Sequence, residues 1–294
     1  MPQHKSQTTS DALAHLPTEL YSDIVQYTRI ADRATLYALL FVSHAFNNAA
    51  AGKLYYNPWV TCQGEREIFV LALKAIATCP HNALLVRELY VGEVFLSRGM
   101  ADEQAASLAE DVKVALHHVY PSAHNLNSLT LSQVGAEGLY PIIEHVNFQL
   151  ETLDICGQRM GSTTQYWASF LSDQHEIKEL SLSLQPLFNR DVQTSLPISF
   201  LPKLVTLCCS RNDAAYLCPR RSISHLTLLG SRIHPEIPPV AQIRCSTLKS
   251  LHCMITGSRL TLENIVGCED SLEYFEVFLG VVVESKTVSL LIFR

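Results

Sequence analysis

The chain has 294 residues, of which 48% are hydrophobic and only 17% are charged, so it carries enough apolar material for an extensive core. Its length exceeds the usual size of one compact core, which favours either two domains or one elongated array. The formal net charge of −6 excludes a strongly basic surface, and no apolar run is uncharged over a length that would span a bilayer. We therefore expect neither a nucleic acid nor a membrane as a partner.

The first residues of the chain are polar. Residues 1–11 contain no apolar segment of the kind found in secretion signals, and we expect them to form a disordered tail. The nine cysteines are an odd number in a long chain, which favours reduced thiols in the cytoplasm or the nucleus. Because neither a CxxC pair nor an HExxH motif occurs, we expect no cofactor and no metal; zinc held by distant ligands is the alternative.

Residues 12–60 are rich in helix formers, and we expect them to form a separate helical domain. Pro17 suits the first turn of a helix, and Leu20 and Ile24 then lie along one side of that helix. A second helix is expected near residues 33–46, and its apolar residues include Leu36, Leu39, Leu40 and Val42. A third helix is expected to begin near Phe46. Three helices this short bury little on their own, so such a unit usually needs a partner.

From Val86 onward the pattern apolar-x-x-apolar-x-apolar recurs. The copies are VRELYV, LNSLTL, LETLDI, IKELSL, LVTLCC, ISHLTL, LKSLHC and LEYFEV, which start at residues 86, 126, 150, 177, 204, 223, 248 and 272. Most intervals between starts fall in the range of roughly 20 to 29 residues that is typical of leucine-rich repeats. Each copy alternates with period two, as a short strand does when one of its faces is buried.

Segments with helical spacing precede several of these strands. Residues 107–120, 139–146 and 163–173 each place their apolar side chains on one helical face. A helix followed by a strand, repeated along the chain, needs a neighbour to cover every apolar stripe. Residues 61–294 therefore resemble an irregular leucine-rich-repeat array. We expect an α/β fold in which parallel strands form a curved solenoid, with helices or loops on its convex side.

The array departs from a regular one in two places. Regular repeats have an asparagine or cysteine three residues after the last apolar position, and only the fifth copy does so here, with Asn212. Residues 232–243 contain three prolines and are expected to form a loop on the convex side. The alternative to an array is an ordinary α/β domain whose LxxLxL matches arise by chance, since leucine is common.

The N-terminal helical segment resembles a known module. The stretch LPTELYSDIVQYTRIADRATLYALLFVSHAFNNAA is similar to the F-box, through which substrate receptors attach to a Skp-type adaptor. His44 and Ala45 stand where the family pattern generally has a basic residue. The resemblance implies adaptor binding by Leu16, Pro17, Leu20, Ile24, Leu36, Leu39, Val42 and Phe46. With repeats behind it, the chain resembles an F-box protein of the kind found in fungi.

The resemblance implies a function. Such a protein is the substrate-recognition subunit of an SCF-type cullin E3 ubiquitin ligase: its F-box joins the adaptor and cullin complex, and its repeats bind an unidentified protein substrate. One alternative is that residues 12–60 only cap the array, and another is a non-catalytic repeat scaffold without ligase assembly. We do not expect an enzyme, since the GxSxG, GxxxxGK[ST] and GxGxxG motifs are missing.

Strand geometry predicts where a substrate would bind. In each copy, the residue between the last two apolar positions and the residue just after the motif point away from the core. These residues are small and polar in the middle of the array, whereas large side chains gather in the last three copies. We expect the substrate at Leu229, His252, Met254, Glu276 and Phe278. The alternative is that the chain's own residues 281–294 cover them.

Overall fold

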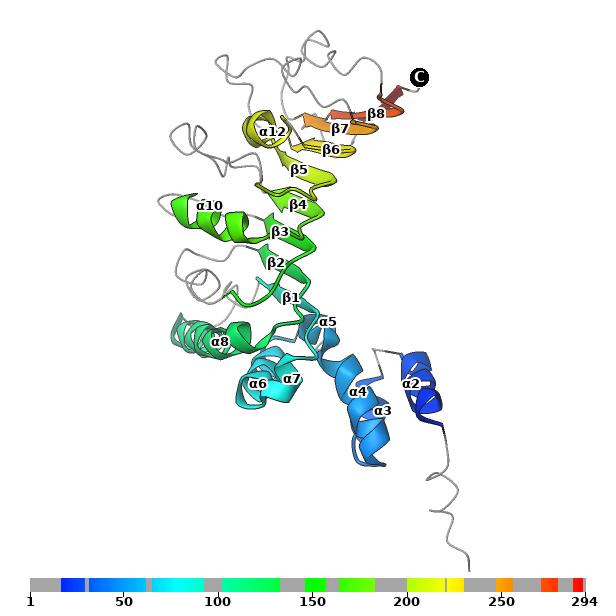
Figure 1. Cartoon of the computed structure of the whole chain (residues 1–294). Helices are drawn as coiled ribbons and strands as arrows, with labels where there is room; N and C mark the ends of the chain where they lie inside the picture. Colours follow the sequence, from blue (N-terminus) through cyan, green and yellow to red (C-terminus); the bar gives the residue numbers. More distant parts are fainter. Residues whose placement is uncertain are drawn as a thin grey trace, which may run out of the picture.

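A computed structural model of the chain describes residues 17–29, 32–61, 65–92, 102–132, 146–156, 164–182, 200–219, 221–229, 247–255, 271–279 and 288–292. In chain order these residues form a small helical unit, three further helices, and one sheet with helices against one of its faces (Figure 1). The architecture is α/β, and the sheet with its eight parallel strands is compatible with a solenoid-like arrangement.

The helical unit contains three helices, as the sequence predicts. They are α2 (Thr18–Tyr27), α3 (Arg33–Leu39) and α4 (His44–Tyr56). α4 packs against both α2 and α3, and the buried residues that they share are Tyr21, Val25, Leu36, Phe46, Ala50 and Leu54. The Asp32 carboxylate accepts a hydrogen bond from the Thr35 N–H and so caps the start of α3. The unit thus has a small core that is separate from the core of the sheet.

Lys53 ties the end of α2 to α4. Its Nζ atom donates hydrogen bonds to the carbonyl oxygens of Val25, Gln26 and Thr28, at 2.9, 2.7 and 2.6 Å. The last carbonyl groups of a helix lack partners within the helix and carry partial negative charge. The Lys53 ammonium group satisfies these carbonyls and holds the two helices together.

Three further helices follow, which are α5 (Pro58–Thr61), α6 (Arg66–Thr78) and α7 (Pro80–Ala83). They bury Phe69, Val70, Leu73, Ile76 and Ala83 in the same core as the sheet. Trp59 stacks on Tyr90 of the first strand, β1 (Glu88–Val91), with their ring centroids 5.0 Å apart. These helices therefore cover the β1 end of the sheet (Figure 1).

Nine strands follow one another across a single sheet in chain order. After β1 they are β2 (Ser128–Ser132), β3 (Thr152–Cys156), β4 (Glu179–Leu182), β5 (Thr206–Ser210), β6 (His225–Leu229), β7 (Ser250–Ile255), β8 (Tyr274–Leu279) and β9 (Val288–Ile292). β1 to β8 are parallel, and each begins at the third residue of one predicted repeat copy, which confirms all eight predicted strands. β9 pairs antiparallel with β8 and was not predicted.

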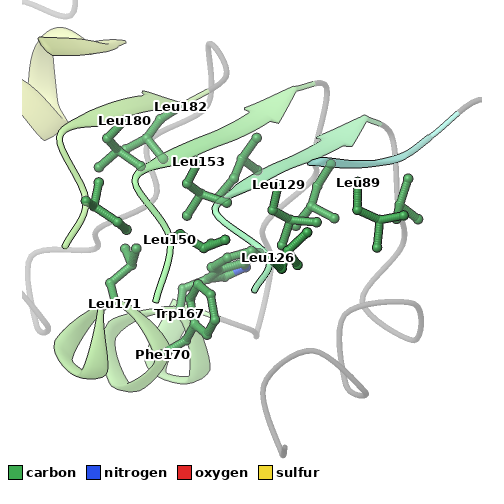
Figure 2. Packing of buried hydrophobic residues seen from close by; sticks show 14 of the residues in the cluster. Leu89, Leu126, Leu129, Leu150, Leu153, Trp167, Phe170, Leu171, Leu180 and Leu182 are labelled. Carbon is green, nitrogen blue, oxygen red and sulfur yellow. The ribbon is translucent and has the colours of Figure 1, made fainter. Parts of the chain in front are cut away.

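The strands pair in the register that the repeats predict. Leu153 pairs with Leu129 on one side and with Leu180 on the other. The same row continues through Leu89, Leu207, Leu226, Leu251 and Phe275. Figure 2 shows leucines of several strands pointing to one side, toward Trp167 and Phe170. Because equivalent positions lie side by side, the copies share one continuous core.

Three helices lie against this buried face, which are α8 (Asp102–Ser122), α10 (Thr164–Asp173) and α12 (Arg211–Leu217) (Figure 1). Their buried side chains include Val112, Leu116 and Val119 on α8, and Trp167, Phe170 and Leu171 on α10, as helical spacing predicts. Most of the expected helix over residues 139–146, and the expected loop over residues 232–243, lie outside the described residues. No helix within the described segments combines the length and apolarity needed to cross a membrane.

A second row of hydrogen bonds runs beside the strands. The Arg87 carbonyl accepts from the N–H groups of Asn127 and Ser128, at 2.9 and 3.0 Å. The same double acceptance recurs at the carbonyls of Asn127, Glu151, Lys178, Val205, Ser224 and Lys249. The row starts in the helical unit, because the Tyr56 carbonyl of α4 accepts from the Arg87 N–H at 3.0 Å. Hydrogen bonds thus join the helical unit to the sheet.

Candidate protein interaction sites

The helical unit carries exposed apolar side chains on α2. Leu20 and Ile24 keep 41% and 43% of their surface exposed. Residues four positions apart lie on the same face of a helix, so these two side chains are neighbours. Tyr21 and Val25 lie on the adjacent face and are buried against α4. α2 therefore buries one apolar stripe inside the unit and leaves a second stripe at the surface.

The other residues implied in adaptor binding differ in exposure. Val42 is exposed and Leu39 is half-buried. Leu36 and Phe46 are buried in the core of the unit, where Phe46 packs edge-on against the Tyr21 ring. Their side chains support the surface from beneath rather than form it. Pro17 is exposed just before α2, and Leu16 lies outside the described residues.

Aromatic side chains on α2, on α3 and just after α3 are exposed as well, and the sequence analysis did not include them among the adaptor-binding residues. Tyr27 and Phe41 are 89% and 87% exposed, and Tyr37 is about half exposed. The apolar run that contains Phe41 and Val42 is longer than one helical face can bury, and this signal was present in the sequence. Large apolar side chains in the open commonly mark an interaction surface. We refer to Leu20, Ile24, Tyr27, Phe41 and Val42 as the helical-unit surface.

The second candidate site is the face of the sheet opposite α8, α10 and α12 (Figure 1). The fifth positions of the repeat copies form one row of paired residues on it, which are Tyr90, Thr130, Asp154, Ser181, Cys208, Thr227, His252 and Glu276. This row is the outward series that strand geometry predicts. The third and seventh positions form the flanking rows. We call the three rows together the open face.

Four polar side chains form a hydrogen-bonded group on the open face at β7 and β8. His252 Nδ1 lies 2.9 Å from Glu276 Oε2, and His252 Nε2 lies 3.0 Å from Ser250 Oγ. The Tyr274 hydroxyl also donates to Glu276 Oε2, at 3.1 Å. Of these four residues, His252 and Glu276 were predicted from the sequence, and Ser250 and Tyr274 were not. Each unpredicted residue stands two positions before a predicted one, a spacing that puts both on the same face of a strand.

The connection from Ser250 through His252 to Glu276 has the order of a nucleophile, a base and an acid. Acyl transfer also needs N–H donors that face the developing oxyanion. The Ser250 N–H donates instead to the Ser224 carbonyl, at 3.0 Å, and the Ser250 side chain is buried. Within the group, each member fixes the orientation of the next.

Apolar residues stand beside this polar group, as the sequence predicts for the C-terminal copies. Leu229 is half-buried, and Met254 is 46% exposed. Phe278 pairs with Met254 in the strand register, but its side chain lies outside the description. β9 pairs with β8 along the edge of the sheet. The chain's own residues 288–292 thus extend the sheet at this edge.

The cysteines of the strands have little nucleophilic character. Cys209 and Cys253 are buried, as their place at the last apolar position predicts. Cys156 donates to Asp154 Oδ1 at 3.0 Å, and burial, followed by this bond, raises the pKa of its thiol to about 12. Burial also raises the pKa of Cys208. Because the thiolate is the nucleophile, the raised pKa of both thiols disfavours their reactive form.

The geometry defines an α/β protein with two surfaces whose side chains suit protein contact. Within the described segments, no three side chains of the His, Cys, Asp or Glu type gather as metal ligands would. No protein-family model matches the chain, and no curated protein matches it.

Proposed function

We propose that the chain is a non-catalytic substrate receptor of an SCF-type cullin E3 ubiquitin ligase. In this proposal α2, α3 and α4 form an F-box that binds a Skp-type adaptor. The strands and their helices form a leucine-rich-repeat array that binds the protein substrate on the open face. Two observations support this proposal: residues 16–50 resemble the F-box, and the eight repeat copies coincide with β1 to β8.

The observation that carries the proposal is the way the β1 end of the sheet is covered. α5, α6 and α7 share the core of the sheet, whereas the helical unit has its own core. The last turn of α4 meets the array, through Tyr55 and the Tyr56 carbonyl, but capping by this turn does not account for the rest of the helical unit. A cap should also be apolar only toward the array. The exposure of Leu20, Ile24 and Phe41 instead favours a surface for a partner.

Burial of one leucine side chain is worth about 1.5 to 3 kcal/mol, and a few such residues dominate most interfaces. Introducing a charge at both Leu20 and Ile24 should therefore abolish adaptor binding. The experiment is calorimetric titration of the purified full chain with a purified Skp-type adaptor. Leu20→Asp combined with Ile24→Asp is compared with Ser22→Asp combined with Gln26→Asp.

The control pair is closely matched to the test pair. Ser22 and Gln26 are exposed on the same helix, stand four residues apart, and receive the same two charges. The control should keep the affinity of the unaltered chain. Undiminished binding by the Leu20 and Ile24 variant would refute the F-box assignment. If the unaltered chain binds no adaptor, a repeat scaffold without ligase assembly becomes the better explanation.

A further inference from the structure

The open face is acidic. Three positions in each of eight repeat copies give 24 residues, and all of them except Ser183 lie within the described segments. Four of these 23 residues are carboxylates, namely Glu88, Asp154, Glu179 and Glu276. None of the 23 is a lysine or an arginine, although the whole chain contains 22 such residues. The open face thus holds a formal charge of −4, against −6 for all 294 residues, so the negative charge of the protein is concentrated there.

These carboxylates have no lysine or arginine as an ion-pair partner within the described segments. Three of the four carboxylates accept hydrogen bonds from uncharged side chains. The Asn57 amide donates to Glu88, the Cys156 thiol to Asp154, and the Tyr274 hydroxyl to Glu276. His252, which also contacts Glu276, is a cation only when it is protonated. No ion pair within the described segments joins any of the four carboxylates to a lysine or an arginine.

The lysines near these strands lie beside the open face and are already paired. Their ion pairs are Lys178 with Glu151 at 2.9 Å, Lys203 with Glu176 at 2.7 Å, and Lys249 with Glu273 at 3.5 Å. Positive and negative charges are therefore paired along one margin of the sheet, whereas the charged residues of the open face, apart from its histidines, are all negative. A face of one sign attracts partners of the other sign and repels partners of its own.

We infer that the open face binds a basic segment of a protein, one that carries two or more lysine or arginine residues. The inference rests on the proposed role as a substrate receptor and names the class of substrate. Asp154 lies on β3 and Glu276 on β8, five strand spacings apart. At about 4.8 Å per spacing this is about 24 Å, which an extended segment of about seven residues spans.

The apolar row supplies the second part of the site. Met254 stands exposed next to His252 and Glu276, and it offers an anchor for an apolar side chain within the basic segment. The negative charge of the open face also favours a basic protein segment over negatively charged partners. Nucleic acids and anionic lipid surfaces carry the same sign of charge as the open face and are repelled by it.

The test uses the full chain and fluorescein-labelled peptides of about twelve residues, enough to cross the open face. One peptide mixes lysine with leucine and glycine, and two further peptides have glutamine or glutamate in place of every lysine. Binding is followed by fluorescence anisotropy at about 0.05 M and about 0.2 M salt. We expect the lysine peptide to bind, more weakly at the higher salt concentration, and the glutamate peptide not to bind.

Two triple variants locate the binding. Asp154→Asn, Glu179→Gln and Glu276→Gln remove three charges from the open face, and Glu151→Gln, Glu176→Gln and Glu273→Gln remove three from the margin. The first set should weaken binding of the lysine peptide by about tenfold or more, and the second by less than about twofold. The pair Asp154→Asn and Glu179→Gln, which leaves the Glu276 hydrogen bonds intact, should cause an intermediate loss and guards against misfolding of the triple variant.

Equal weakening by the two triple variants, or equal binding of the lysine and glutamine peptides, would overturn the inference. Titration of the same protein preparations with the Skp-type adaptor separates the two proposals. If the adaptor binds and the lysine peptide does not, the inference about substrate class fails while the proposed function stands. If the peptide binds and the adaptor does not, the acidic binding face stands without the ligase.

Discussion

The helical unit and the sheet are stabilised in different ways. In the sheet, a buried residue such as Leu153 has an equivalent neighbour on both sides, and the core continues from strand to strand. In the helical unit, Leu36 is just as buried, but it belongs to a small core shared by three short helices. The difference shows that the burial of a side chain does not by itself determine how far the effect of its substitution spreads through the molecule. A defect in the sheet is passed to its neighbours, whereas one in the helical unit remains local.

Leu153→Ala and Leu36→Ala test this difference most strongly. Each should cost about 2 to 5 kcal/mol, since both substitutions remove a fully buried leucine. Hydrogen exchange should show lost protection on β2, β3 and β4 for Leu153→Ala, but only within residues 17–56 for Leu36→Ala. Thr152→Ala, beside the first site, should change stability far less. Loss of strand protection in the Leu36 variant would mean that the two regions unfold as one.

Lys53→Met should destabilise the helical unit alone. It removes three hydrogen bonds to carbonyl oxygens at the end of α2, and we expect a loss of about 1 to 3 kcal/mol. The control is Lys74→Met, which removes a half-exposed ion pair with Asp111 and should cost less than about 1 kcal/mol. Hydrogen exchange of the α2 amides measures the first loss, and exchange of the α6 amides measures the second. If the two variants behave alike, the link between α2 and α4 does not depend on Lys53.

Gly92→Ala probes the first strands of the sheet. An added Cβ atom would lie 2.8 Å from the Cβ of Ser132 and 2.7 Å from the hydroxyl oxygen of Tyr90. Crowding of this kind costs about 1 to 3 kcal/mol. Ser132→Gly should recover part of the loss, because it removes one of the two clashes. Urea denaturation of both single variants and of the double variant measures the coupling, and full additivity would contradict the predicted contact.

Gly52→Ala should have the smallest effect, and its sign should be opposite. Gly52 lies within α4, and an added Cβ atom would meet no other atom within 4 Å. Alanine is favoured over glycine inside a helix by about 0.5 to 1 kcal/mol, so the helical unit should become more stable. Hydrogen exchange within α4 should slow. A faster exchange would show that the surroundings of Gly52 are more crowded than described.

The strands could be predicted from the sequence because their signals are local. A period of two and a regular repeat interval place each strand, and alignment of the copies then gives the register of rows such as the one through Leu153 and Leu180. The helices on the buried face follow from the spacing of residues such as Trp167 and Phe170. Predicting these features does not require knowing which distant segments of the chain come into contact.

Other features depend on tertiary contacts and could not be predicted in the same way. Helical spacing shows that Leu36 belongs to an apolar face, but not whether that face meets α4 or a partner. The apolar spacing of Phe69, Leu73 and Ile76 indicates a helix, yet nothing local says that this helix covers the end of the sheet. The bonds among Ser250, His252 and Glu276 depend on side-chain rotamers, which no spacing rule supplies.

The bond from the Arg87 N–H to the Tyr56 carbonyl has a mechanical consequence. The last turn of α4 takes the place of a preceding repeat, so turning the helical unit against the sheet would break the first bond of the row. The two ends of the segment that carries α5, α6 and α7 are also joined, because the Asn57 amide donates a hydrogen bond to the Glu88 carboxylate. These two hydrogen bonds oppose rotation of the helical unit against the sheet, so they would restrict the distance and angle between two molecules bound at the helical-unit surface and on the open face.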